Sequence, residues 1–475
     1  MAHDYRTHSL QEERDALSYT PVRRHSDRGH DRHNGAEGRY SDPPQGPKAY
    51  TYHMTRRGKT WGTLTLLADP NLSKSTPTFV EPDTQAEESV TRAEFHGHAK
   101  GGGTREGAMV SGMVSLNLQS TETIHSVRVT VQGQLSIGAA APFTFLDVFA
   151  TPWTREMGDP RGEAVAGQWN GKLRGTYEWP FAVRLPRAVV LPVGTPPRER
   201  NYALPAGFWE RHEPVRVRYH VVLHVARGAF KSNIRLPVEI AYAPLSHPPP
   251  ASSARQLAYK EHHSIPPPDV DPDGWHTPRS VVTRGAIAGQ REVEVTCSFS
   301  IAQPLCYTRG SVIPCALILE AHDASALDLL SSPTAIVARL RRRLRYKSDI
   351  GRALDEDGWQ ESTSVYETAS WWPREGAPQH TYRRCMDGEI HLKEDLKPST
   401  SLAHWQIEYE VVLFPFDVLS FASRDAGPLL VQPVEIATGV RTWTTTACFH
   451  SAIVRVCESG RAGGAFLTTF LSCSV

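Results

Sequence analysis

A five-residue string, PVEIA, occurs twice in this chain of 475 residues, at positions 237–241 and again at 433–437. The stretches before the two copies also match, because VRVRYHVVLHV precedes the first and WQIEYEVVLFP precedes the second. Aligning them places Tyr219 on Tyr409, each followed by Val-Val-Leu two residues later. The duplication predicts two units of similar design, and in each unit the PVEIA strand should pair antiparallel with the preceding Tyr-x-Val-Val-Leu strand.

Alternation of apolar and polar residues is the dominant pattern along the rest of the chain. In IHSVRVTVQGQLSI the valines at 127, 129 and 131 alternate with polar residues, and VRVRYHVVLHV alternates in the same way. This period of two is typical of half-buried strands, and helical periodicity is nearly absent. Short strands joined by turn residues predict an all-β protein of two tandem immunoglobulin-like β-sandwiches.

Composition sets the expected boundaries. Residues 1–58 contain few aliphatic side chains and are expected to form a disordered N-terminal tail. The first sandwich is expected over 59–243 and the second over 279–445. Between them, 244–278 carries nine prolines, including two triple-proline runs, and is expected to be an extended linker. Residues 446–475 are expected to form a C-terminal tail.

Charge and cysteine content exclude several classes of protein. The net charge is +1, which gives no general attraction to nucleic acid, and no apolar run approaches the roughly 20 residues of a membrane span. The start of the chain has no apolar core and does not resemble a secretion signal. Seven cysteines without a C-x-x-C motif predict free thiols in a reducing compartment. Cys297, Cys306 and Cys315 are expected to be strand residues rather than zinc ligands.

Motifs that carry enzymatic chemistry are missing from the sequence. It contains no G-x-S-x-G elbow, no H-E-x-x-H pair and no P-loop. The glycine-rich GGGT at 101–104 does not follow a strand-to-helix pattern and is interpreted as a loop. We therefore expect no enzymatic activity, no cofactor and no metal.

A run of basic residues in AIVARLRRRLRYKSD is the first candidate binding feature. If the segment is a strand, one face presents five cations, namely Arg339, Arg341, Arg343, Arg345 and Lys347. If it is a helix, an apolar face forms instead and the arginines surround it. We favour the strand, because the neighbouring segments are β. Such a stripe is suited to anionic tails, since arginine holds phosphate oxygens bidentately, although an ordinary solvated face would have the same pattern.

A second basic set lies in the duplicated strand of the first half. Arg216, Arg218 and His220 are expected to point outward, whereas Val215, Val217 and Tyr219 are expected to point inward. Both basic sets are candidate anion-binding or cargo-binding residues.

The order of these motifs resembles the arrestin family in its broad form, which includes the fungal arrestin-related proteins. The resemblance covers about 61–445 and is carried by GMVSLNL, IHSVRVTVQGQ, GTYEWPFAVRLPRAVVLP, and the two Tyr-x-Val-Val-Leu and PVEIA pairs. It implies two concave sandwiches and a cytoplasmic, non-enzymatic adaptor recruited to the plasma membrane or endosomes. Such an adaptor would bind cytoplasmic tails of receptors or transporters and link them to ubiquitination, endocytosis or trafficking.

The resemblance also leaves alternatives open. The resemblance to fungal adaptors that recruit ubiquitin ligases implies a PPxY peptide, which docks in a WW-domain groove. The two proline runs of this chain, HPPPASS and SIPPPDVD, lack the tyrosine of that peptide. A ligase or coat protein would then be reached through an indirect contact. Anionic lipid headgroups are a further candidate partner, and nucleic acid is not. The alternative function is a constitutive structural subunit of a trafficking coat, like the arrestin-fold subunit of retromer.

Overall fold

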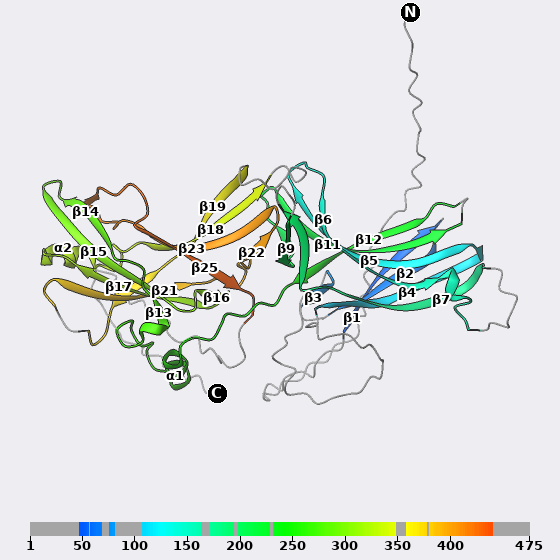
Figure 1. Cartoon of the computed structure of the whole chain (residues 1–475), viewed down its shortest axis with the longest axis horizontal. Helices are drawn as coiled ribbons and strands as arrows, with labels where there is room; N and C mark the ends of the chain where they lie inside the picture. Colours follow the sequence, from blue (N-terminus) through cyan, green and yellow to red (C-terminus); the bar gives the residue numbers. More distant parts are fainter. Residues whose placement is uncertain are drawn as a thin grey trace, which may run out of the picture.

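The computed structural model describes residues 47–439, apart from 57, 69–75, 81–106, 163–170, 194–197, 229–230, 348–357 and 378–379. Within this part the protein is all-β, with two short α-helices, and its sheets form two groups that lie side by side along the long axis (Figure 1). We call strands β1–β12 the first half and strands β13–β25 the second half. Residues 1–46 of the predicted N-terminal tail and all of the predicted C-terminal tail at 446–475 lie outside the described residues.

The first half contains two main sheets. One has the strand order β1-β2-β4-β7, and the other has the order β3-β12-β11-β5-β6, with β10 pairing β11 and a separate β8–β9 hairpin. The strands are β1 Lys48–Arg56, β2 Lys59–Ala68, β3 Thr78–Val80, β4 Met109–Glu122, β5 Ile124–Ile137, β6 Phe143–Thr154, β7 Leu173–Arg184, β8 Ala188–Val193, β9 Arg198–Ala203, β10 Phe208–Trp209, β11 Val215–Arg227 and β12 Ile234–Ala243. A 3₁₀ turn, Arg155–Met157, follows β6.

The second half repeats this plan. One sheet has the order β20-β21-β17-β15-β14-β24 with β13 on β15, and the other has the order β16-β25-β23-β18-β19 with β22 on β23. The elements are α1 Ser253–Glu261, a 3₁₀ turn Pro272–Gly274, β13 Trp275–His276, β14 Val281–Ile287, β15 Arg291–Ala302, β16 Cys306–Thr308, β17 Val312–Glu320, α2 Ala324–Leu330, β18 Ala338–Lys347, β19 Trp359–Thr368, β20 Ser370–Pro373, β21 Arg383–His391, β22 Thr400–Leu402, β23 Trp405–Leu413, β24 Phe421–Ser423 and β25 Leu430–Ala437.

Alternation along each strand places the apolar side chains between the sheets. On β11 every predicted inward residue is buried, and Tyr219 is fully inaccessible. The opposing sheet contributes Leu64 and Val114 to the same core, and the rings of Trp153 on β6 and Trp179 on β7 lie 5.9 Å apart across the layer. Each half is therefore consistent with a β-sandwich, whose inner faces bury most of the apolar area.

The duplicated strands occupy equivalent places, which confirms the predicted pairing. β12 pairs antiparallel with β11, and β25 pairs antiparallel with β23. Tyr219 and Tyr409 are both buried, and their hydroxyls donate to the carbonyls of Pro205 at 2.6 Å and Lys397 at 2.7 Å. The PVEIA strands are not the ends of their sheets, because β3 and β16 pair with them in parallel.

The proline-rich segment 244–278 is not an open extended chain in the structure. It contains α1, and the side chains of Arg255 and Trp275 are buried. The Arg255 guanidinium donates to the Gln303 carbonyl, and the Trp275 indole packs against Ala302 and Ala316. The segment therefore lies against the second half, because these two large side chains provide an anchor that proline content does not reveal.

The predicted start of the first half was too late. β1 occupies residues that the sequence assigned to the disordered tail, and it pairs with β2 along its full length. Its inward positions include Met54, which is buried, and Tyr50 and Tyr52, which pack on the core. The prediction counted aliphatic residues, so it missed a strand whose apolar surface is largely aromatic. No helix in the described part of the chain is long and apolar enough to cross a membrane.

Candidate anion-binding face

The outward side of β11 brings basic residues into one line. Arg216 and Arg218 are exposed, whereas His220 and His224, further along the same strand, are half-buried. Residues two apart on a strand point to the same face, about 6.7 Å from one another. The predicted set Arg216, Arg218 and His220 therefore lies on one surface, as expected from the alternation.

Neighbouring strands add two arginines that the sequence analysis missed. His224 lies directly opposite Arg128 on β5 and opposite Arg235 on β12, and both arginines are exposed. Side chains directly opposite one another on adjacent strands share a face and lie close together. We call the surface formed by Arg128, Arg216, Arg218, His220, His224 and Arg235 the β11 face.

Few carboxylates balance these charges. Within the described residues, none of the four arginines of the β11 face has a carboxylate oxygen within 4.0 Å. Arg235 donates to the amide oxygen of Gln132 at 3.4 Å instead. Two acidic residues, Asp147 on β6 and Glu239 on β12, share the face by strand register. The surface therefore keeps a positive excess that is open to solvent.

Two exposed aromatic rings flank the β11 face. Phe149 is 58% exposed, and the Arg128 guanidinium lies 4.4 Å from the centre of its ring. Trp209 is 62% exposed and is opposite Arg216 in the β10–β11 pair. Exposed rings beside arginines can contact the apolar or planar parts of a bound segment, while the guanidinium groups hold its anionic groups.

The environment of the two histidines keeps them neutral. Burial lowers the pKa of His220 below its ordinary 6.5, and Arg218 and Arg235 add to this against the opposing charge of Glu239. Burial also lowers the pKa of His224, together with Arg235 and Arg128, whereas Asp147 acts in the opposite direction. The anion-binding charge of the face at neutral pH therefore comes from its arginines.

These pKa shifts predict a dependence of stability on pH. Below pH 6.5 the unfolded chain binds protons at both positions while the folded chain resists them, so the free energy of unfolding should fall as the pH drops from 6.5 through the lowered folded pKa values. Thermal melts between pH 7 and pH 5 should show this fall, and the double variant His220→Gln, His224→Gln should show a smaller one. Equal pH slopes for the two proteins would contradict the assignment.

The predicted basic run forms strand β18 rather than a helix. We call its alternate cations the β18 stripe, namely Arg339, Arg341, Arg343, Arg345 and Lys347. These cations are more buried and more often paired than predicted. Arg341 donates to Glu410 at 2.6 Å, and Arg343 is bidentate to Glu361 at 2.9 and 2.6 Å. Arg345 lies 4.0 Å from Glu361, and Arg339 packs over the ring of Phe414. Lys347 was predicted to be exposed, yet it is only 5% exposed and lies beside Trp359. Much of this charge is therefore balanced within the sheet.

The repeat explains why one basic set is balanced and the other is not. The alignment that places Tyr219 on Tyr409 also places Arg218 on Glu408 and His220 on Glu410. In the second half these two glutamates lie opposite Arg343 and Arg341 of β18. In the first half the corresponding partners on β5 are the neutral Gln134 and Gln132. β23 therefore carries acidic residues at the positions where the equivalent strand of the first half, β11, carries basic residues.

The remaining arginine of β18 joins the two halves. Arg342 points inward with a side chain only 3% exposed, and its two terminal nitrogens each lie 2.7 Å from a carboxylate oxygen of Glu210. Glu213 lies 3.6 Å away and accepts from Ser362 at 2.9 Å. Burial lowers the pKa of Arg342, but the hydrogen bonds to Glu210 together with the charges of Glu210, Tyr366 and Tyr409 raise it above its ordinary value. We call Arg342, Glu210, Glu213 and Ser362 the interhalf clamp.

Aromatic contacts accompany the clamp. The rings of Phe208 and Trp405 lie 5.2 Å apart, and the Phe143 ring meets the His404 ring edge-on at 5.2 Å. Each pair joins the first half to the second. The interface therefore combines a buried ion pair with packed rings.

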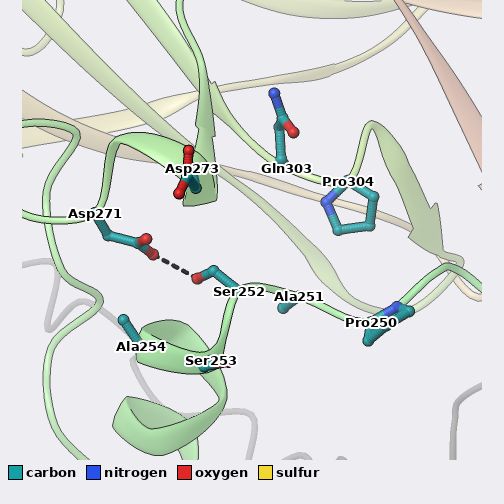
Figure 2. A pocket seen from close by; sticks show the side chains of 9 residues that line it. All are labelled: Pro250, Ala251, Ser252, Ser253, Ala254, Asp271, Asp273, Gln303 and Pro304. Atoms are coloured by element: carbon teal, nitrogen blue, oxygen red, sulfur yellow. Dashed lines mark hydrogen bonds between the residues drawn. The ribbon is translucent and has the colours of Figure 1, made fainter.

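A polar pocket of about 440 Å³ lies where the segment before α1 meets the second half (Figure 2). Its lining includes Ser252, whose hydroxyl donates to the Asp271 carboxylate and accepts from the Arg255 backbone at 3.2 Å. Gln303, also in the lining, accepts the Arg255 guanidinium. These groups hold 251–276 against the second half, so we interpret the pocket as part of that docking.

Comparison with known proteins adds no family to this description. No protein-family model matches the chain, and no curated protein matches it. The arrestin resemblance therefore remains a prediction carried by the order of the motifs. The fold and the site define an all-β protein of two joined halves. One of its sheets presents a basic face that is flanked by two exposed aromatic rings.

Proposed function

We propose that this protein is a non-enzymatic adaptor of the arrestin-like type. It binds anionic cytoplasmic segments of membrane proteins through the β11 face and links them to ubiquitination, endocytosis or trafficking. The observation that carries the proposal is a contrast between two basic sets. Arg216 and Arg218 are exposed and have no carboxylate partner among the described residues, whereas the β18 stripe is largely balanced by Glu361 and Glu410. The partner on this face is an acidic or phosphorylated segment.

The geometry of the β11 face suits an extended segment. The basic residues follow one strand, and an extended peptide repeats its side-chain direction with the same period of two residues. One exposed arginine contributes only about 0–1 kcal/mol to an ion pair, so several contacts along the segment are needed for useful affinity. Phosphate groups add bidentate, charge-assisted hydrogen bonds to guanidinium groups.

The arrangement of the two halves supports an immunoglobulin-like, arrestin-like fold. Both duplicated tyrosines donate to a backbone carbonyl upstream in their own half, and each PVEIA strand lies between a Tyr-x-Val-Val-Leu strand and a short parallel strand. Two sandwiches held together by a buried clamp give a rigid platform for one exposed face. A rigid platform lowers the entropic cost of binding a flexible segment.

A capture experiment tests the proposed function. Proteins bound in cells would be recovered with the unaltered chain and with the double variant Arg216→Glu, Arg218→Glu. The adaptor function predicts substoichiometric receptors or transporters together with a ubiquitin ligase, and their loss from the variant. Stoichiometric coat proteins that are recovered equally with both chains would instead favour a constitutive trafficking subunit.

A further inference from the structure

A second cavity lies at the end of the first half away from the second, where the start of β2, the end of β4 and Lys231 meet. Its volume is about 430 Å³, and its lining includes Lys59, Trp61, Gln119, Glu122 and Lys231. A volume of this size is within the range of small-molecule sites. We call it the tip pocket. None of its residues belongs to the β11 face or to the interhalf clamp.

The charges around the tip pocket do not cancel. Glu122 is buried and accepts from Arg227 at 2.8 Å and from Lys231 at 2.5 Å, so two cations share one carboxylate. Lys59, at the rim, contacts the neutral amide oxygen of Gln119 at 3.4 Å. These three cations and the one carboxylate leave a formal excess of two positive charges among the described residues named here. Burial opposes the charge on Glu122, but Lys231 and Arg227 hold its pKa below its ordinary value.

Part of this excess positive charge lies on Arg227, whose side chain is buried and therefore poorly solvated. The side chain of Arg227 is only 4% exposed, and its guanidinium lies 5.5 Å from the centre of the Trp61 ring. Its Nε has no hydrogen-bond partner among the residues that the structure describes. A buried cation that is not fully compensated is costly, and an anion in the adjoining cavity would reduce that cost. Amide and hydroxyl groups of Asn117, Gln119, Thr60 and Ser120 line the same cavity and can donate to anionic oxygens.

The shape of the site indicates more than a bare ion. The cavity is larger than one phosphate group, and Trp61 forms part of its wall. An indole wall favours a planar or apolar group attached to the anion. We propose that the tip pocket binds a phosphate dianion carried by a small soluble molecule, with Lys59 and Lys231 holding the phosphate oxygens and the attached group facing Trp61.

Calorimetric titration of the full chain tests this assignment, with inorganic phosphate and phenyl phosphate as probes. Sodium chloride at matched ionic strength controls for screening. We expect saturable binding of both probes, tighter for phenyl phosphate. The double variant Lys59→Gln, Lys231→Gln should weaken binding of each probe by at least about tenfold, because it removes two charge-assisted contacts. Lys260→Gln, the same exchange on exposed α1, should leave binding unchanged.

Three results would overturn the proposal. The first is the absence of saturable binding beyond the chloride control, and the second is equal binding by the unaltered chain and the double variant. The third result comes from sedimentation with phosphatidylcholine vesicles that contain or lack a phosphorylated inositol lipid. Lysine-dependent binding to the phosphorylated vesicles, without binding of phenyl phosphate, would assign the pocket to a membrane headgroup instead of a soluble molecule. Binding of phenyl phosphate without sedimentation supports the soluble ligand.

Discussion

Replacing Tyr219 by aspartate is expected to unfold the first half of the protein, and the same change at Tyr409 is expected to unfold the second half. Both side chains are at most 1% exposed, and both lie at the centre of a core between two sheets. A buried carboxylate that lacks a cation of its own costs several kcal/mol or forces a rearrangement, which is a large share of the roughly 5–15 kcal/mol that stabilises a typical domain. Arg342 lies opposite position 409, but it is already paired with Glu210, so a new carboxylate there would compete for the same cation. Calorimetry would show a reduced heat of unfolding in each variant, because the altered half no longer contributes to it.

The matched controls are Tyr219→Phe and Tyr409→Phe. Each removes the hydroxyl that donates to Pro205 or Lys397, and at Tyr409 the contact of that hydroxyl with Arg342 is lost as well, so each should cost about 1–3 kcal/mol and leave the fold intact. Similar losses for the two phenylalanine variants would support the structural equivalence of the tyrosines. Melting that is unchanged by either aspartate would contradict the placement of both side chains in the cores.

The second large effect is expected at the interhalf clamp. Arg342→Ala should destabilise the protein by about 3–5 kcal/mol, because it leaves Glu210 and Glu213 without their cation at a mostly buried position. It should also separate the unfolding of the two halves, since the clamp contributes a buried ion pair to their interface. Calorimetry and small-angle scattering would measure the stability and the relative placement of the halves.

Arg343→Ala is the control on the same strand. Its side chain is 34% exposed and pairs with Glu361, which is 37% exposed, so its loss should cost at most about 1 kcal/mol. Equal destabilisation by the two variants, or no change in the coupling of the halves in Arg342→Ala, would show that the clamp does not hold the halves together.

The positions of β11 and β23, and the side of the sheet to which their side chains point, could be predicted well from the alternation of apolar and polar residues alone. On β11 and β23 every second residue is buried, because one face of each sheet lies against a core. Cys297, Cys306 and Cys315 lie in strands, as expected, and Cys297 and Cys315 are buried. The exact register of the strand pairs could not be predicted from the sequence, because it differs between the two copies. Pro237 pairs with Val222, whereas Pro433 pairs with Glu410, which lies two positions closer to the aligned tyrosine.

The candidate site could be predicted only in part. Arg216 and Arg218 were found because their strand is duplicated, but Arg128 and Arg235 join them only through the pairing of β5 and β12 with β11. Arg342 and Glu210 are separated by 132 residues, and no local pattern connects them. The β18 stripe misled for the same reason, since Glu361 and Glu410, which balance its arginines, lie on neighbouring strands.

The central claim is that the β11 face, rather than the β18 stripe, binds anionic segments. The most direct measurement is the affinity for a phosphorylated peptide and its unphosphorylated form, at low and high salt, with three chains. These are the unaltered protein, Arg216→Glu with Arg218→Glu, and the triple variant Arg341→Glu, Arg343→Glu, Arg345→Glu.

We expect the unaltered protein to prefer the phosphorylated peptide, and the preference to weaken as the Debye length falls from about 10 Å at 0.1 M salt to about 3 Å at 1 M. The β11 double variant should lose at least about tenfold in affinity, more than the β18 triple variant loses, because the β18 arginines are already paired within their sheet. Equal affinity of the unaltered protein for both peptides, insensitive to salt and to the β11 reversal, would contradict the claim.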